Sequence, residues 1–384
     1  MESNFLKQTL LAALPASTTG ILVAVSGGVD SVVLLHLLTR LAPELGLQVQ
    51  AAHLDHQIRA TSGQDADVVA QLCRRWDCPC QIEQRDVPAL ARKQKVSLEM
   101  AGRQARRDFL GQLARSRQVD LVALAHHRDD QVETFLLRLL RGTGQSGLAG
   151  MQIQDGLWWR PLLPCSRTQI LEYAQQHRLT WVEDESNRDP TYLRNWIRNR
   201  LVPQLLAINP RFRERIAATT RQNQLEEDYW QDQVTSGFQR LAEVTQEGVN
   251  LSRDGLLQLH PALRMRLYRE ALRRVRGDLL KIEAVHLHAI DDLVVAATSQ
   301  AQLDLPTAWV ARRYQQLWFR CRAPAETQAF CLELPLPGRL GLPDGRVLEA
   351  TIESRAQGES ATTAEFSLAA IDSPLLVRSW RAGD

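Results

Sequence analysis

The chain has 384 residues, of which 44% are hydrophobic and 23% are charged, so it can bury sizeable cores and is neither disordered nor collagen-like. Its 46 basic and 44 acidic residues leave a net charge of +2, so any nucleic-acid surface must come from local clusters of charge. Six cysteines are too few for a disulfide scaffold, and neither a signal peptide nor an apolar stretch of about 18 residues is recognisable. We therefore expect a cytoplasmic protein of about two or three domains that does not enter the membrane.

The first 140 residues alternate short apolar runs with segments of helical periodicity. Strands are predicted at 21–25, 48–54, 80–84 and 121–125, and helices at 31–41, 62–76, 98–114 and 130–140. Strands that alternate with crossover helices are typical of a mostly parallel sheet covered on both faces. The pattern therefore predicts an α/β fold with a Rossmann-like N-terminal domain.

The remainder of the chain predicts a different organisation. Helices are expected at 166–177, at 192–206 and, in a polar segment, from 217 to about 245, with more helices through about 297. Residues 301–320 read as two strands, and Gly/Pro-rich text beyond 331 indicates a small β-containing tail. We expect three domains: an α/β domain at 1–215, a mainly helical domain at 216–325 and a small C-terminal domain at 326–384.

The segment between the first strand and the first helix has the composition of a phosphate-binding loop. It reads Ser26, Gly27, Gly28, Val29, Asp30, Ser31. Two glycines let the backbone approach phosphate oxygens, the helix N-terminus favours anions, and a carboxylate can hold Mg²⁺. A Walker lysine is missing, which excludes a P-loop. The alternative is an ordinary tight turn before a capped helix.

Two more polar segments follow predicted strands, at the edge where open α/β sheets bind ligands. The first contains Asp55, a candidate base or magnesium-linked carboxylate, and Arg59, which could meet phosphate or RNA. The second is His126-His127-Arg128-Asp129-Asp130-Gln131-Val132-Glu133-Thr134, whose acids could make a second metal contact. The alternatives are a locally hydrogen-bonded turn for the first, and helix caps or a zinc site for the second. Zinc is disfavoured because Cys or a third His at ligand spacing is missing.

The loop at 26–31 resembles the pyrophosphate loop of the ATP-pyrophosphatase superfamily, whose members cleave ATP between the α- and β-phosphates. With LDHQIR, AHHRDDQVET, LLRGTGQSGLAGM, RPLLPCSRTQILEY, WVEDESNRD and YLRNWIR, the chain is similar to the tRNA(Ile)-lysidine synthetase family across residues 21–210. Beyond 215 the similarity is one of layout. The chain departs from the family pattern at Arg107, where a tyrosine is usual. Members typically continue past the position of Asp384, so we expect a short or incomplete C-terminal domain.

The resemblance implies a two-step reaction. ATP binds to the 26–31 loop with Mg²⁺ held by Asp30 and Asp130, and the wobble cytidine of a CAU-anticodon isoleucine tRNA is adenylated on its carbon-2 oxygen. The ε-amine of free lysine then displaces AMP, which changes the codon read from AUG to AUA. Asp55 is the expected base, because the amine has an unperturbed pKa of about 10.4. Arg103 is expected to stabilise the phosphate charge.

Binding of lysine or the tRNA is expected from His56, Arg59, Arg106, His126, Asp129, Glu133, Thr134, Arg194, Asn195 and Arg198. Residues 85–117 hold nine basic and three acidic side chains, and smaller basic clusters lie at 188–200 and 264–281. Trp196, between Arg194 and Arg198, could stack on an unpaired base. The alternative for each cluster is a solvated helix face. The protein is expected to be a monomer or a homodimer.

Two other functions stay open at this point. A cytidine thiolase of the same superfamily would carry paired cysteines, but the chain has Cys78-Pro79-Cys80 and lacks C-x-x-C. A non-catalytic RNA-binding protein would have no need of carboxylates at three sheet-edge positions, where Asp30, Asp55 and Asp130 are intact. The residues thus favour an ATP-dependent enzyme.

Overall fold

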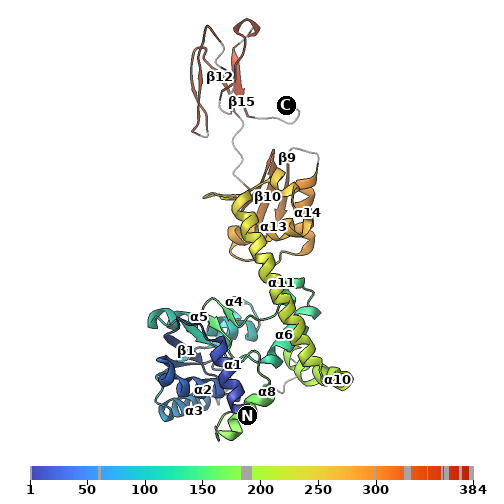
Figure 1. The fold of residues 1–384 in the computed structure, drawn as a ribbon. Helices are drawn as coiled ribbons and strands as arrows, with labels where there is room; N and C mark the ends of the chain where they lie inside the picture. Colours follow the sequence, from blue (N-terminus) through green and yellow to red (C-terminus); the bar gives the residue numbers. More distant parts are fainter. Residues whose placement is uncertain are drawn as a thin grey trace. The chain divides into compact units, whose positions relative to one another are not determined.

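The computed structural model describes residues 2–58, 62–182, 193–296, 300–323, 330–343, 345–355, 358, 363–371 and 374–379. The chain divides into two compact units, Met1–Asp232 and Gln233–Asp384 (Figure 1). Helix α11 (Phe212–Leu241) runs through both the observed division and the boundary at 215 expected from the sequence. The finer division into three domains stays a proposal. None of the described helices has the length and apolar character needed to cross a membrane.

Six of the described strands form the sheet of the first unit, in the order β3-β2-β1-β4-β6-β5. Their bounds are β1 (Gly20–Ala24), β2 (Gln48–Asp55), β3 (Cys80–Gln84), β4 (Leu121–Ala123), β5 (Gln154–Asp155) and β6 (Trp158–Trp159). Strands β3, β2, β1, β4 and β6 are parallel, and β5 runs antiparallel to β6. The predicted α/β fold with a mostly parallel sheet is confirmed.

Side chains that alternate along β1 build one core on each face of the sheet. Ile21 and Val23 belong to one core and Leu22 to the other, as the two-residue period of a strand requires. The first core includes residues of α1 (Glu2–Ala13), α2 (Val29–Leu45), α3 (Ser62–Arg75) and α8 (Arg167–Gln176). The second is covered by α4 (Val87–Gln94) and α5 (Leu98–Arg117).

The parallel strands bring the polar segments to one edge of the sheet. The 26–31 loop follows β1, Asp55 ends β2, and His126 and His127 lie between β4 and helix α6 (Arg128–Leu140). Helix α6 packs through Val132 and Leu136 on a helical segment made of α9 (Leu193–Trp196), a π-helical turn (Ile197–Leu201) and α10 (Val202–Ile208). The short helix α7 (Gln145–Leu148) follows α6. The helix expected at 192–206 is confirmed over its described part.

The second unit contains a five-stranded antiparallel sheet in the order β7-β8-β11-β10-β9. Its strands are β7 (Ala242–Val244), β8 (Gly248–Ser252), β9 (Gln300–Leu305), β10 (Ala308–Arg313) and β11 (Gln316–Arg320), and its helices are α12 (Arg253–Leu257), α13 (Pro261–Arg276) and α14 (Ala284–Val295). The two strands expected within 301–320 are present as β9 and β11, but the segment between them, expected as a turn, contains a third strand, β10. The 216–325 segment therefore mixes helix and sheet. Strand β10 is buried on both faces, so its sequence lacks the alternation that reveals a strand.

The C-terminal part of the second unit consists of two strand pairs. Strand β12 (Cys331–Leu334) pairs with β15 (Leu375–Arg378), and β13 (Gly338–Gly341) pairs with β14 (Val347–Ala350). A short 3-10 helix, Leu368–Ala370, precedes β15. The predicted β character of this tail is confirmed.

Candidate active site

Hydrogen bonds of its own serines stabilise the loop after β1. The Ser26 backbone N–H donates to Ser31 Oγ over 3.1 Å, and that hydroxyl donates to the Gly28 carbonyl over 2.9 Å. Gly27 has φ +90°, a conformation that side chains rarely adopt, and Gly28 is the N-cap of α2. The loop therefore ends in a helix N-terminus without a capping side chain, a position that binds anions.

Asp30, in the first turn of α2, carries a buried carboxylate oxygen beside this loop. Among the described residues its Oδ1 has no hydrogen-bond partner, and it lies 3.7 Å from His127 Nε2. Burial raises the pKa of Asp30, with a further upward contribution from the charge of Asp130, while His127 and Arg167 act against it. A buried polar atom without a partner is uncommon in proteins, and a bound ion is one explanation for it. The donor set here suits a hard cation.

Asp130 approaches the same ring nitrogen of His127 as Asp30 does. Its Oδ2 accepts the backbone N–H of His127 over 3.0 Å and lies 3.5 Å from His127 Nε2. Burial by itself would raise the pKa of Asp130, but His127 and Arg194 hold it below its usual value. Asp30 and Asp130 therefore form a pair of carboxylates near one imidazole nitrogen, with pKa values shifted in opposite directions.

Two arginines of the 193–201 segment contact the acids of α6. Arg194 donates to Glu133 Oε2 over 2.8 Å and to Asp130 Oδ1 over 3.1 Å. Arg198 contacts both oxygens of Glu133 and lies 3.3 Å from Asp130 Oδ1. Arg198 lies in the π-helical turn, a feature that is frequent at functional sites. Two guanidinium groups thus neutralise two carboxylates at the edge of the site.

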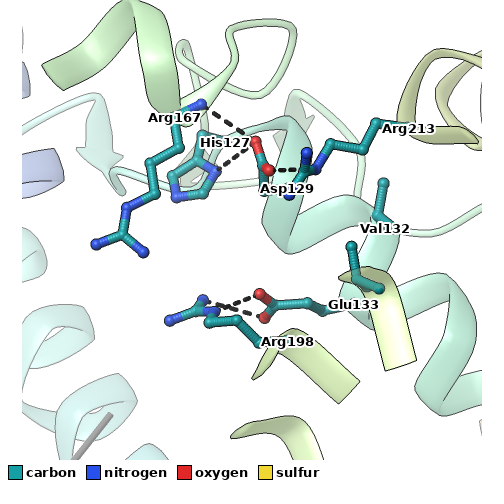
Figure 2. Close-up of a pocket in the computed structure, with 8 residues that line it drawn as sticks. His127, Asp129, Val132, Glu133, Arg167, Arg198 and Arg213 are labelled. Atoms are coloured by element: carbon teal, nitrogen blue, oxygen red, sulfur yellow. Dashed lines mark hydrogen bonds and ion pairs between the residues drawn. The ribbon is translucent and has the colours of Figure 1, made fainter. Parts of the chain in front are cut away.

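A pocket opens between these groups (Figure 2). Asp129 accepts the backbone N–H of Arg167 over 3.1 Å and is paired with Arg213 Nε at 2.6 Å. The Arg167 side chain extends away from Asp129 (Figure 2), and its charge lowers the pKa of Asp30. The pocket is lined by His127, Asp129, Val132, Glu133, Arg167, Arg198, Val202 and Arg213. Arg167 and Arg213 were not expected as site residues.

Asp55 and His56 form a second group, at the end of β2. Asp55 is buried, and its Oδ1 accepts the Gln57 backbone N–H over 2.9 Å. His56 Nε2 lies 3.2 Å from Nη2 of Arg106. Burial and the charge of Arg106 lower the pKa of His56 to about 4. The imidazole is therefore neutral near pH 7, and its Nε2 can accept a hydrogen bond from the Arg106 guanidinium.

Positive charges gather near Arg103 on α5. Burial is the largest cause that lowers the pKa of Arg106 and Arg138, and the charge of Arg103 is the second. The charge of Arg103 also lowers the pKa of Arg160. Burial lowers the pKa of His126 to about 4, and Arg160 and Arg194 add to that effect. Arginines that repel each other in this way form a surface for anions. Arg103, Arg106 and His126 thus influence one another's charge state or that of a shared neighbour, and their roles stay a prediction.

The other expected residues lie in the same elements. Thr134 is on α6 and Asn195 on α9, while Arg59 is outside the described residues. Within the described part of the chain, no group of three or more His, Cys, Asp or Glu side chains could hold a metal by itself. Asp30 and Asp130 still fit Mg²⁺, because that ion is commonly held by one or two carboxylates together with substrate phosphates.

Two segments of this chain are similar to known protein families. Residues 1–205 match the family model of a PP-loop domain, and residues 251–318 match that of the TilS substrate binding domain. The tRNA(Ile)-lysidine synthase of Geobacter sulfurreducens is 38% identical over 372 residues, covering 95% of this chain and 79% of that relative. That of Geobacillus kaustophilus is 32% identical over 373 residues, covering 95% and 80%. The chain belongs to the tRNA(Ile)-lysidine synthase family.

Membership of this family decides between the functions that the sequence left open. The activity is that of a tRNA(Ile)-lysidine synthase, an ATP-dependent ligase that modifies tRNA. The PP-loop domain binds ATP, and the substrate binding domain implies tRNA(Ile) as the substrate. The predicted family, ATP requirement and reaction class are confirmed.

Proposed function

We propose that this chain joins free L-lysine to carbon 2 of the wobble cytidine in a CAU-anticodon isoleucine tRNA, with Mg²⁺ as cofactor. The observation that carries this proposal is that three features meet at one sheet edge. They are the phosphate loop, the Asp30 carboxylate, whose Oδ1 lacks a hydrogen-bond partner among the described residues, and an acid–arginine cluster made of Asp130, Glu133, Arg194 and Arg198. We further propose that the protein works in the cytoplasm, which holds the ATP and tRNA pools, as a monomer or homodimer.

The first step adenylates the cytidine. The loop at 26–31 receives the pyrophosphate part of ATP, and Asp30 and Asp130 would hold Mg²⁺, which lowers the charge on the phosphate oxygens when bound. The carbon-2 oxygen of cytidine attacks the α-phosphorus, and the bond from that phosphorus to the pyrophosphate oxygen breaks. Arg103 and its neighbouring cations stabilise negative charge on the phosphates.

Lysine fits the acid–arginine cluster by its charges. Its ammonium group matches the carboxylates of Asp130 and Glu133, and its carboxylate matches a guanidinium of Arg194 or Arg198. Both oxygens of Asp130 already accept hydrogen bonds, from Arg194 and from the His127 backbone. Among the hydrogen bonds of the described residues, Asp130 Oδ2 accepts only that of the His127 backbone N–H, so a cation could approach this oxygen while Oδ1 keeps its arginine contacts. Asn195 lies in the same helical segment as these arginines.

The second step forms the carbon–nitrogen bond. The lysine ε-amine attacks carbon 2 of the adenylated cytidine, the carbon–oxygen bond to AMP breaks, and the amine loses a proton. Asp55 is the proposed acceptor of that proton, since it is a carboxylate at the sheet edge on the other side of β1 from α6. His56, Arg106, His126 and Arg59 are proposed to contact the anticodon loop.

The proposal is tested by incorporation of labelled lysine into a CAU-anticodon isoleucine tRNA transcript, with ATP and Mg²⁺. We expect label in this tRNA together with one AMP and one pyrophosphate for each lysine, and little label in a methionine tRNA that has the same anticodon. Omission of Mg²⁺ should abolish AMP formation. AMP formation without label would show that the second substrate is not lysine, and retained activity without a divalent cation would overturn the role of Mg²⁺.

A further inference from the structure

A second pocket of the first unit lies away from the phosphate loop. It is lined by His36, Thr39 and Arg40 of α2, by Arg75 and Trp76 at the end of α3, and by His177 and Leu179 after α8. We call it the Arg40–Arg75 pocket. Arg40 follows Asp30 by ten residues of one helix, which separates their Cα atoms by about 15 Å at 1.5 Å per residue. The pocket has a volume of about 380 Å³ and is open to solvent.

The Arg40–Arg75 pocket carries positive charge that its lining does not neutralise. No acidic side chain is among the described residues that line it. In addition to burial, the charges of His177, Arg40 and Arg75 lower the pKa of His36 to about 4. Burial and Arg40 also lower the pKa of His177. The active-site pocket differs, because Asp129 and Glu133 pair there with Arg213 and Arg198.

The His36 ring, which lines this pocket, is packed between other rings. His36 is only 6% exposed, and its ring centroid lies 5.1 Å from that of Trp76 and 5.1 Å from that of His177. Its Nδ1 is 2.9 Å from the Tyr173 hydroxyl, which leaves Nε2 as the ring nitrogen that a ligand can use. The imidazole is therefore oriented before any ligand arrives.

We propose that the Arg40–Arg75 pocket binds a phosphate group, at a site separate from the ATP loop. Guanidinium groups form paired hydrogen bonds with phosphate oxygens, and Trp76 offers an aromatic surface beside them. A buried histidine with a lowered pKa gains a proton more easily once an anion neutralises the arginines around it. The phosphate could belong to a small molecule or to an RNA backbone, and the experiment below distinguishes these two sources.

The test follows the imidazole NMR signals of His177 and His36 in the full chain. The probes are inorganic phosphate, pyrophosphate and isoleucine tRNA. Phosphate binding should raise the titration midpoint of His177 by at least about half a pH unit. This shift should vanish in the double variant Arg40→Gln/Arg75→Gln. The matched control is Arg74→Gln/Arg178→Gln, which removes the same charge beside the pocket without altering its lining, and it should keep the shift.

The source of the phosphate follows from the tRNA arm. If the pocket holds an RNA backbone, Arg40→Gln/Arg75→Gln should bind tRNA about tenfold more weakly. The slope of the logarithm of its tRNA affinity against the logarithm of salt concentration should become shallower by about two. The Arg74→Gln/Arg178→Gln control should show neither change. If it holds a small molecule, tRNA affinity should be the same in both variants while the NMR shift with phosphate or pyrophosphate persists in the control. Absence of any selective effect on His177, with equal tRNA binding by both variants, would overturn the proposal.

Discussion

Asp30 and Asp130 are two carboxylates near one imidazole whose pKa values are shifted in opposite directions. Burial raises the pKa of Asp30, whose Oδ1 has no hydrogen-bond partner within the described structure. Asp130 is the more deeply buried of the two, yet His127 and Arg194 together with a backbone N–H hold its pKa low. A divalent cation would compensate the charge of Asp30, whereas the protein itself already compensates Asp130. The proposed Mg²⁺ would therefore change the charge balance more at Asp30 than at Asp130.

At the same scale, Asp55→Asn tests the proposed base. The amide keeps an oxygen that can accept the Gln57 N–H, so the fold should persist, but it cannot accept a proton at neutral pH. We expect lysine ligation to fall by on the order of 10²–10⁴-fold, with adenylation of the tRNA largely retained. Single-turnover assays that separate the adenylated tRNA from the product measure both steps. Full ligation by this variant would exclude Asp55, and Asp108→Asn, on the exposed face of α5, serves as the control.

At the scale of the element, the phosphate loop depends on one backbone conformation. A Cβ at Gly27 would meet Val69 and Val182 at 3.7 and 3.8 Å, which is ordinary contact, so the strain of Gly27→Ala comes from its φ of +90°. We expect this variant to lose about 1–2 kcal/mol of unfolding free energy and to bind ATP more weakly. Gly28→Ala is the matched control, because its φ is −72°. Chemical denaturation that finds both variants equally stable would contradict this account.

The contact between α6 and the 193–201 segment is the second feature at this scale. Glu133 is buried and accepts hydrogen bonds from Arg194 and Arg198, whose side chains remain partly exposed. Removing one member of a buried ion pair costs more than the pair contributes, because a charge is left without a partner. The contact between α6 and the 193–201 segment is thus made by charges that could also pair with a charged substrate.

At the scale of the whole molecule, each of the two compact units has its own core. Tyr268, Leu267 and Phe319 lie in the core of the second unit, and Arg264 makes two hydrogen bonds of 2.7 Å to Asp291. The Tyr268 hydroxyl donates to the same carboxylate over 2.8 Å. This network joins α13 to α14 within the region that matches the substrate binding domain.

Asp291→Asn tests whether the units are energetically separable. The change leaves the guanidinium of Arg264 without its counter-charge, and we expect the second unit to lose about 3 kcal/mol of stability. Weakened tRNA binding should accompany normal ATP binding by the first unit. Asp292→Asn, at an exposed neighbour on α14, is the control. An equal loss of ATP and tRNA binding would contradict separable units.

The Arg264–Asp291 pair also predicts how the stability of the second unit depends on pH. Burial would raise the pKa of Asp291, but its hydrogen bonds from Arg264 and Tyr268 hold the value below that of a free aspartate. The stabilisation is therefore present above the unfolded pKa of about 3.9 and is lost as the pH falls through the lower folded value. The stability difference between the wild type and Asp291→Asn should shrink below about pH 4 in denaturation experiments.

The sequence alone determined the features that depend on local pattern. The parallel sheet and the loop at 26–31 could be predicted because strands, crossover helices and glycine turns have short-range signatures. The carboxylates at three sheet-edge positions followed from the rule that parallel strands end at one edge. Strand β10 escaped prediction because burial on both faces removes its alternation.

Only the tertiary structure decided which charges meet. Arg194 and Glu133 are 61 residues apart in the chain, and Arg213 reaches Asp129 across a still longer interval. Arg167 and Arg213 therefore carried no spacing signal that could have placed them in the candidate active-site pocket. The Arg40–Arg75 pocket likewise draws on α2, on the end of α3 and on residues after α8. Such contacts depend on the packing of helices on the sheet, because that packing brings distant side chains within hydrogen-bond distance.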